Sequence, residues 1–178
     1  MPAQKYFLAI VIPEPFYSEV EDLKQDLYRR FGLKGALRCP AHITLHRPFV
    51  WQEDKEEKLI RTLNQFQSGR HFELGLQNFS FFAPRVIYID VIQNPELDNL
   101  HQNLLRFAKR ELHLFNEADD NRGFHPHLTI ASRDLKKPLF HELQAEFSGR
   151  PYAARFQVTT FCLLKLRKTW EVLKTFPV

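Results

Sequence analysis

The same order of sequence patterns occurs twice in this chain, and this repeat is the strongest constraint on its fold. Residues 6–12 form a nearly unbroken apolar run that ends at Pro13, and residues 86–92 form a second run that ends before Pro95. Near-continuous apolar runs predict strands with both faces covered. Each run is followed by a helical pattern, a second strand pattern, a shorter helical pattern and a closing strand pattern. We therefore predict strand–helix–strand–helix–strand in each half.

Equivalent positions in the two halves lie at nearly constant separation. The separation is 80 residues for Arg70 and Arg150, Gln77 and Gln157, and Phe81 and Phe161, 82 for Pro13 and Pro95, and 85 for His42 and His127. Loops of different length produce a drift of this size, whereas two copies are too few for a solenoid. The pattern predicts an α+β fold with an internal duplication, in which halves 1–84 and 85–178 form two lobes. Whether the lobes exchange strands is left open.

Length and composition favour a single folded domain over residues 1–178. Hydrophobic residues make up 44% of the chain and include 17 phenylalanines, which is ample for a packed core. The net charge of +4 permits a phosphate-rich partner without requiring one. No block of five or six like charges occurs, which argues against a tail that coats nucleic acid non-specifically.

The remaining compositional signals concern compartment and assembly. The first apolar run is too short to cross a bilayer and lacks a signal-peptide cleavage pattern, so we expect no membrane association. Cys39 and Cys162 are too few for a disulfide scaffold and lack metal-ligand spacing, so we expect structural thiols in a cytoplasmic protein. Because a duplicated chain supplies its own pseudo-symmetric pair, we expect a monomer.

Each half contains one His-x-Thr motif in a strand pattern, with His42 and Thr44 in the first half and His127 and Thr129 in the second. Alternate residues of a strand share a face, so histidine and threonine point one way while the intervening aliphatic residue points to the core. If the lobes are related by an approximate two-fold axis, these polar faces line the groove between them. The motifs would then place two imidazoles and two hydroxyls around one site.

This set of side chains suits displacement at phosphorus. Histidine, with an ordinary pKa of about 6.5, serves as acid or base near neutral pH. One imidazole can take a proton from the attacking group while the other donates a proton to the leaving oxygen. Threonine hydroxyls can hydrogen-bond the non-bridging oxygens, where negative charge builds in the transition state.

The paired motifs resemble those of the two-histidine (2H) phosphoesterase superfamily, and within it the bacterial 2′-5′ RNA ligase-like group. Besides both His-x-Thr motifs, the second shows the Phe-x-Pro-His-x-Thr context through Phe124 and Pro126. The resemblance covers nearly the whole chain. It implies a bilobal fold in which two antiparallel sheets line a central cleft, with helices on the outside.

The same resemblance implies an RNA-processing phosphodiesterase that needs neither metal nor cofactor. Such enzymes open 2′,3′-cyclic phosphates of RNA ends or small cyclic nucleotides to 2′-phosphates, and some join RNA ends through 2′-5′ linkages. It makes His42 and His127 the acid/base pair and Thr44 and Thr129 the phosphate-binding residues. We assign His127 as base and His42 as leaving-group acid, an assignment that the sequence does not decide.

Further residues near the motifs are candidate substrate contacts: His46, Phe49, Phe124, His125 and Arg133. By alternation, the two extra histidines share the face of the nearer motif, and the aromatic rings could stack a nucleobase. Arg133 is displaced by Ser132 from the Thr-Leu-Ala-Arg pattern that is frequent in the family. Phosphate contacts could also come from Arg38, Arg47 and Arg122. For each of these residues, a core or surface position is the alternative.

Two other functions remain open at this point. Four histidines, His42, His46, His125 and His127, could instead form a metal-dependent active site, although no carboxylate lies near either motif and such a site does not require both threonines. The chain could also be a non-catalytic module that binds RNA or nucleotides. A pure binder, however, has no use for two opposed titratable groups.

Overall fold

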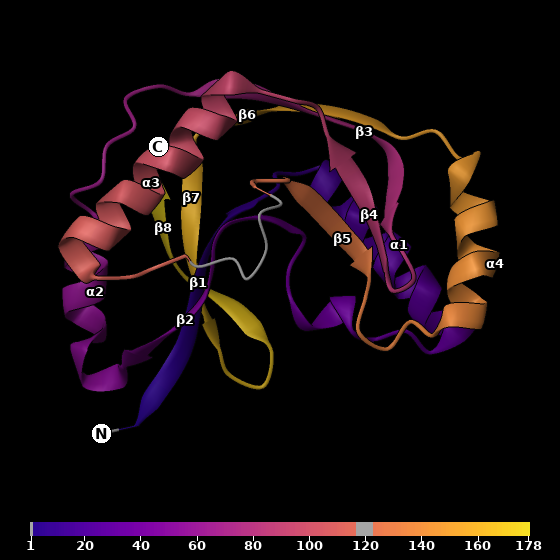
Figure 1. Cartoon of the computed structure of the whole chain (residues 1–178), viewed down its shortest axis with the longest axis horizontal. Coiled ribbons are helices and arrows are strands. Elements are labelled where there is room, and N and C mark those ends of the chain that lie inside the picture. Colours follow the sequence, from indigo (N-terminus) through magenta and orange to yellow (C-terminus); the bar gives the residue numbers. More distant parts are fainter. Residues whose placement is uncertain (1, 117–122) are drawn as a thin grey trace.

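A computed structural model describes residues 2–116 and 123–178, which form two four-stranded antiparallel sheets with helices on their outer sides (Figure 1). The first sheet has the order β2-β1-β7-β8 and consists of β1 (Ala3–Val11), β2 (His42–Gln52), β7 (Thr160–Leu166) and β8 (Trp170–Pro177). The second has the order β5-β4-β3-β6 and consists of β3 (Phe72–Phe82), β4 (Val86–Val91), β5 (His127–Ala131) and β6 (Ala153–Val158). The predicted pair of antiparallel sheets is confirmed.

The helices complete the predicted order of elements in both halves. They are α1 (Phe16–Phe31), α2 (Glu56–Leu63), α3 (Pro95–Leu112) and α4 (Lys137–Ser148), with short 3₁₀ turns at Ala36–Arg38 and Glu53–Lys55. Helices α1 and α4 pack on the second sheet, whereas α3 packs on β2 of the first sheet and α2 packs on α3. In Figure 1 the two helix pairs flank the sheets at opposite ends of the molecule. Among the described residues, no helix is both long and apolar enough to cross a membrane.

Local sequence determines where the second-half helix α3 begins and ends. The Asn94 side chain accepts a hydrogen bond from the Leu97 N–H at 3.0 Å, and Pro95 occupies the first helical position, where its missing N–H costs nothing. His113 ends the helix in the left-handed conformation. The proline after the second apolar run therefore starts a helix, as predicted.

Each sheet contains strands from both halves of the chain. Strand β3, from the first half, pairs with β4 from Leu76↔Val91 to Phe82↔Val86. Reciprocally, β7 from the second half pairs with β1 from Tyr6↔Lys165 to Ala9↔Cys162. The helix α1, which follows β1 of the first sheet, packs on β5 of the second. The halves are therefore interlocked, and neither can complete a sheet alone.

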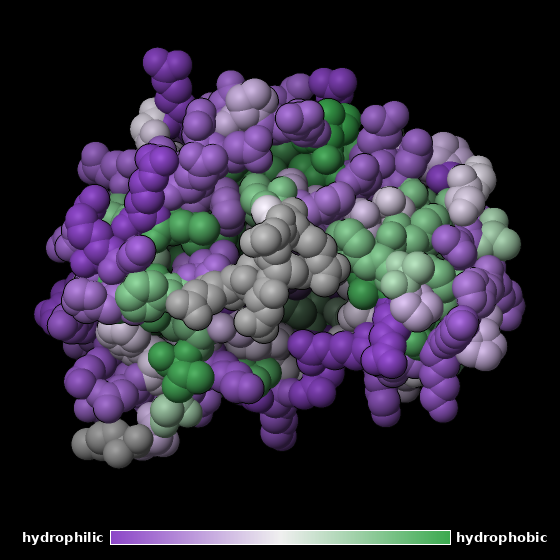
Figure 2. Space-filling view, viewed as in Figure 1, coloured by the Kyte–Doolittle hydropathy of each residue, from purple (hydrophilic) through white to green (hydrophobic). Residues whose placement is uncertain are grey.

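One apolar cluster joins residues from all four helices and both sheets. Its rings include Phe66, which packs edge-on against both Phe107 and Phe161 at centroid distances of 5.4 and 5.6 Å. Such pairs add to the free energy gained from burial alone. On the outside, Figure 2 shows hydrophilic residues over most of the viewed face, with apolar residues gathered in smaller patches.

A buried lysine closes the end of the first sheet next to α2. Lys165 is 6% exposed, and its Nζ donates to Glu53 Oε1 at 2.8 Å and Glu56 Oε2 at 2.6 Å. The Tyr6 hydroxyl donates to the same Glu56 oxygen at 2.6 Å. Burial alone would raise the pKa of Glu56, but the hydrogen bonds from Lys165 and Tyr6 lower it overall. The network ties β1 and β7 to the start of α2.

We expect Lys165→Met to lower the free energy of unfolding by roughly 1–3 kcal/mol, because it leaves two partly buried carboxylates without their cation. Urea denaturation at pH 7 measures this, and Lys174→Met, at an exposed site on β8, is the matched control. Glu56 has a lower pKa in the folded protein than in the unfolded chain, so its contribution to stability is present above the unfolded pKa and is lost as the pH falls. The difference in unfolding free energy between wild type and Lys165→Met should therefore shrink below about pH 4.5. A loss no larger than that of the control would contradict the role given to Lys165.

Candidate active site

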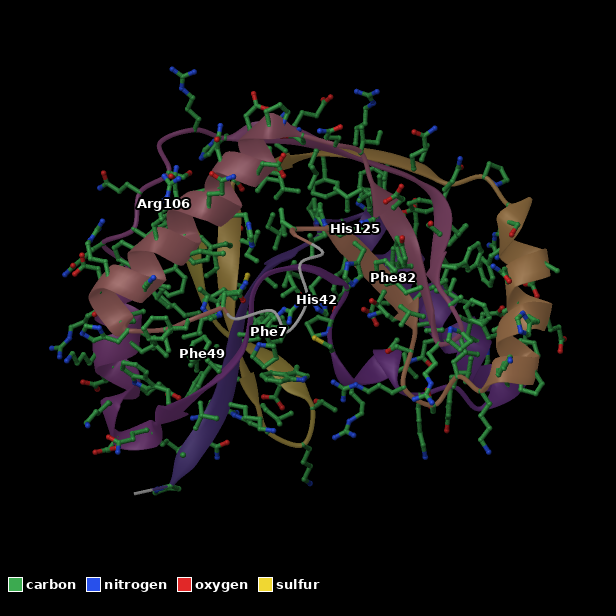
Figure 3. The ribbon with its side chains drawn as sticks, in the orientation of Figure 1. Phe7, His42, Phe49, Phe82, Arg106 and His125 are labelled. Atoms are coloured by element: carbon green, nitrogen blue, oxygen red, sulfur yellow. The ribbon has the colours of Figure 1, made fainter. Side chains whose placement is uncertain are left out.

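The two motif histidines begin the outer strands of the two sheets where those sheets meet. His42 is the first residue of β2 and pairs with Val11, and His127 is the first residue of β5 and pairs with Asp90. Strands β2 and β5 contact each other, and a charge on His127 lowers the pKa of His42. Figure 3 shows His42 near the middle of the molecule, between the sheets. The fold thus brings together the strands that carry the two motif histidines.

Both imidazoles are oriented by the same hydrogen bond. Nδ1 of His42 lies 2.7 Å from the carbonyl oxygen of Pro40, and Nδ1 of His127 lies 2.7 Å from the carbonyl oxygen of His125. A carbonyl only accepts, so each Nδ1 must carry a proton. In the neutral ring, Nε2 is then an acceptor, and in the charged ring it is a donor. Each histidine therefore has Nε2 free for proton transfer.

Burial favours the neutral form of both rings. It is the chief cause that lowers the pKa of His42 to about 4, with further contributions from the charges of Lys24 and His127. Burial likewise lowers the pKa of His127, and a charge on His125 adds to this effect. The hydrogen bond to the His125 carbonyl and the Asp90 carboxylate act in the opposite direction.

Aromatic side chains pack around both imidazoles. Phe7 lies edge-on to His42 at a centroid distance of 5.1 Å and is itself packed against Trp170 at 4.7 Å. Phe82 and Tyr88 pack against His127 at 5.0 and 5.3 Å. Three of these aromatic residues, Phe7, Tyr88 and Trp170, lie in apolar runs or a distant hairpin that carry no separate signal in the sequence. These contacts restrict rotation of the rings.

Two hollows adjoin at Thr44. The first has a volume of about 210 Å³ and is lined by both threonines and by His42, Lys24, Arg38, Arg133, Phe7 and Trp170, among others. The second has a volume of about 660 Å³ and is lined by Thr44, Arg47, Phe82, His101, Phe124, His125 and His127, among others. One of the two motif histidines therefore faces each hollow. A group held by the threonines would have a proton acceptor or donor on two sides.

The prediction that His46 shares the face of His42 and Thr44 is wrong. Thr44 pairs with Ala9 while His46 pairs with Leu8, so Leu45 is an extra residue in β2 that breaks the alternation. His46 is 1% exposed and packs edge-on against Phe49 at 5.3 Å. Phe49 is buried and stacks on Tyr6, so it too lies in the core. Neither residue lines either hollow.

The other candidates lie at the hollows. Phe124 stacks on the ring of His101 at 3.6 Å. His125 lines the same hollow, with Nε2 at 3.3 Å from the Tyr88 hydroxyl. Arg133 lines the first hollow despite its displacement by Ser132. Arg122 lies outside the described residues.

The structure separates the four histidines of the metal-site alternative. His46 packs in the core, away from the hollows that the other three line. Within residues 2–116 and 123–178, no three histidine, cysteine, aspartate or glutamate side chains are arranged to hold a metal ion. The four-histidine set proposed from spacing is therefore not assembled.

Comparisons with known proteins agree with this geometry. The sequence matches the family model described as the 2′-5′ RNA ligase superfamily over residues 12–170. A Bacillus cytotoxicus protein named "Putative phosphoesterase" is 29% identical over 163 residues, which cover 88% of this chain and 89% of that protein. A Bacillus thuringiensis protein of the same name is 33% identical over 163 residues, which cover 88% of this chain and 89% of that protein.

Solved structures show the same fold over the whole chain. E. coli LigT complexed with 3′-AMP aligns with a TM-score of 0.63 and 21% identity, covering 99% of both chains. The protein TT0787 of Thermus thermophilus aligns with a TM-score of 0.63 and 18% identity, covering 97% of both chains.

We expect both histidines to carry the proton on Nδ1 when neutral, because each Nδ1 donates to a backbone carbonyl. Long-range ¹H–¹⁵N correlation spectra distinguish this tautomer from the commoner Nε2–H form, and His42→Gln and His127→Gln variants assign the signals. In a pH titration, His42 should become charged only near pH 4. An Nε2–H tautomer at either ring would contradict the proposed orientation.

Proposed function

This chain belongs to the 2′-5′ RNA ligase superfamily of two-histidine phosphoesterases, and on that basis we propose that it is a metal-independent cyclic phosphodiesterase. Its substrates are 2′,3′-cyclic phosphates of RNA ends or small nucleotides, which it opens to 2′-phosphates. The names of its Bacillus relatives support phosphoester chemistry. The nucleotide in the E. coli LigT complex supports a nucleotide substrate.

One observation carries this proposal: the identical hydrogen bond from Nδ1 to a carbonyl two residues earlier in His42 and His127. It leaves two Nε2 atoms available on different sides of Thr44. In-line displacement requires a base beside the attacking group and an acid beside the leaving group. Thr44 and Thr129 stand between them as donors to the non-bridging phosphate oxygens.

The electrostatics of the site favour His42 as base and His127 as acid, the reverse of the assignment made from sequence. The pKa of His42, lowered to about 4, keeps that ring neutral, whereas at His127 the hydrogen bond to the His125 carbonyl and the Asp90 carboxylate oppose the lowering by burial. Binding of the anionic phosphate between the rings raises the pKa of both, which completes the protonation of the acid.

In this mechanism, Nε2 of His42 takes a proton from water as the water oxygen bonds to phosphorus. The bond between phosphorus and the ribose 3′ oxygen breaks, and Nε2 of His127 donates its proton to that oxygen. The products are a 2′-phosphate and a 3′-hydroxyl. With a 5′-hydroxyl in place of water, the same step forms the 2′-5′ linkage that the family name describes.

We expect His42→Ala and His127→Ala each to lower kcat on adenosine 2′,3′-cyclic phosphate by about 10²–10⁴-fold, since each removes one proton-transfer group. Chromatography should identify adenosine 2′-phosphate as the wild-type product, formed equally fast with EDTA. His141→Ala, exposed on α4, is the matched control. Turnover that survives either site substitution would refute the acid/base pair, and loss of turnover with EDTA would support the metal-dependent alternative. Binding without turnover would support a binding module.

We expect Thr44→Val and Thr129→Val each to lower kcat by about 10- to 10³-fold with a smaller change in KM, because valine keeps the shape but removes a donor to the transition state. Thr175→Val, exposed on β8, controls for loss of a strand hydroxyl. Steady-state kinetics would count against a phosphate-binding role if both site variants matched this control.

A further inference from the structure

The hollow around His42 carries more positive charge than a cyclic phosphodiester can neutralise. Arg38 and Arg133 line it, and neither makes an ion pair with any residue in the described part of the chain. Among the described residues, no aspartate or glutamate lines the hollow, and the third cation, Lys24, is paired with Glu21 at 2.8 Å. A cyclic phosphodiester brings a single negative charge. Two uncompensated guanidinium groups therefore leave capacity for a second anion.

The two arginines are carried by loops from different halves that are fastened together. Arg38 ends the 3₁₀ turn Ala36–Arg38 before β2, and Arg133 follows β5. The Asp134 carboxylate accepts hydrogen bonds from the Lys34 N–H at 2.8 Å and the Gly35 N–H at 3.1 Å. Because charged acceptors make the stronger hydrogen bonds, this carboxylate holds the two loops in register across the hollow.

The backbone on both sides of this junction allows the two loops to approach each other closely. A Cβ on residue 35 would lie 2.5 Å from the Ser132 carbonyl oxygen, so only glycine fits there. Arg133 adopts φ of 60°, a left-handed conformation that non-glycine residues seldom take. The extra residue Ser132 is accommodated by this turn, which brings the Arg133 side chain to the hollow.

We propose that Arg38 and Arg133 form a subsite for a second phosphate, with Asp134 as the residue that positions them. The preferred substrate is then a nucleoside 2′,3′-cyclic phosphate that also bears a phosphate on its 5′ carbon, as every RNA end does through its last internucleotide linkage. Guanidinium groups suit this role because their paired N–H groups match two phosphate oxygens. This inference rests on the proposed function, since it places the second phosphate relative to the reacting one.

The first test compares wild-type kcat/KM on adenosine 2′,3′-cyclic phosphate with and without a 5′-phosphate. We expect the 5′-phosphate to raise kcat/KM by about 10- to 100-fold, the range of a charge-assisted contact. Arg38→Ala and Arg133→Ala should each bring this ratio towards one. Arg106→Ala is the matched control, because Arg106 is an exposed arginine of α3 that does not line this hollow (Figure 3).

The positioning role of Asp134 requires a separate readout. Asp134→Asn keeps the shape but removes the charge, and it should raise KM for the 5′-phosphorylated substrate about 2- to 10-fold with little change in kcat. If kcat instead fell equally on both substrates, Asp134 would support the fold rather than the subsite.

A binding measurement separates the subsite from the chemistry. By calorimetry, adenosine 2′,5′-bisphosphate should bind wild-type protein at least 10-fold more tightly than adenosine 2′-phosphate, and Arg133→Ala should abolish the difference. Equal affinities together with equal kcat/KM on both substrates would overturn the subsite and leave the phosphodiesterase proposal standing. Tighter, Arg133-dependent binding of the bisphosphate without turnover of either substrate would support the subsite and overturn the proposed function.

Discussion

The chemistry of this site depends on a hydrogen bond that is made twice, from an imidazole Nδ1–H to the backbone carbonyl two residues earlier. Its net energy is modest, about 0.5–1.5 kcal/mol for a neutral pair. Its main effect is to select one tautomer and one direction for each ring, and a reaction that moves protons needs both. The acceptors are main-chain groups, so the orientation of each ring depends on the path of the backbone as well as on the aromatic side chains packed around it.

That backbone path is fixed by the exchange of strands between the halves. Strand β2 lies at the edge of its sheet beside β1, and β1 is held on its other side by β7 from the second half. The second sheet is arranged alike, with β4 between β5 and β3. In the described part of the chain, each histidine therefore begins an outer strand with one sheet neighbour, and that neighbour is anchored by the opposite half. The spacing of the two rings thus depends on both sheets.

The sequence was sufficient to predict the two antiparallel sheets and the order of elements, because both follow from hydrophobic periodicity. That His42 and His127 act in one site stays a prediction. The sequence was insufficient for His46, because one extra residue at Leu45 turns His46 to the other face, and a bulge leaves no mark in an apolar pattern. The junction of Asp134 with Gly35 was also beyond prediction. It joins loops about a hundred residues apart, through backbone N–H groups that every residue except proline possesses.

Covalent fusion of the two halves has a consequence for the specialisation of the site. In a symmetric pair of identical half-chains, symmetry would force equal surroundings on both imidazoles. In the single chain each ring has acquired its own neighbours, Lys24 and Cys39 beside one and Asp90 beside the other. A single chain can therefore adjust the pKa of each ring separately, which a symmetric homodimer cannot do.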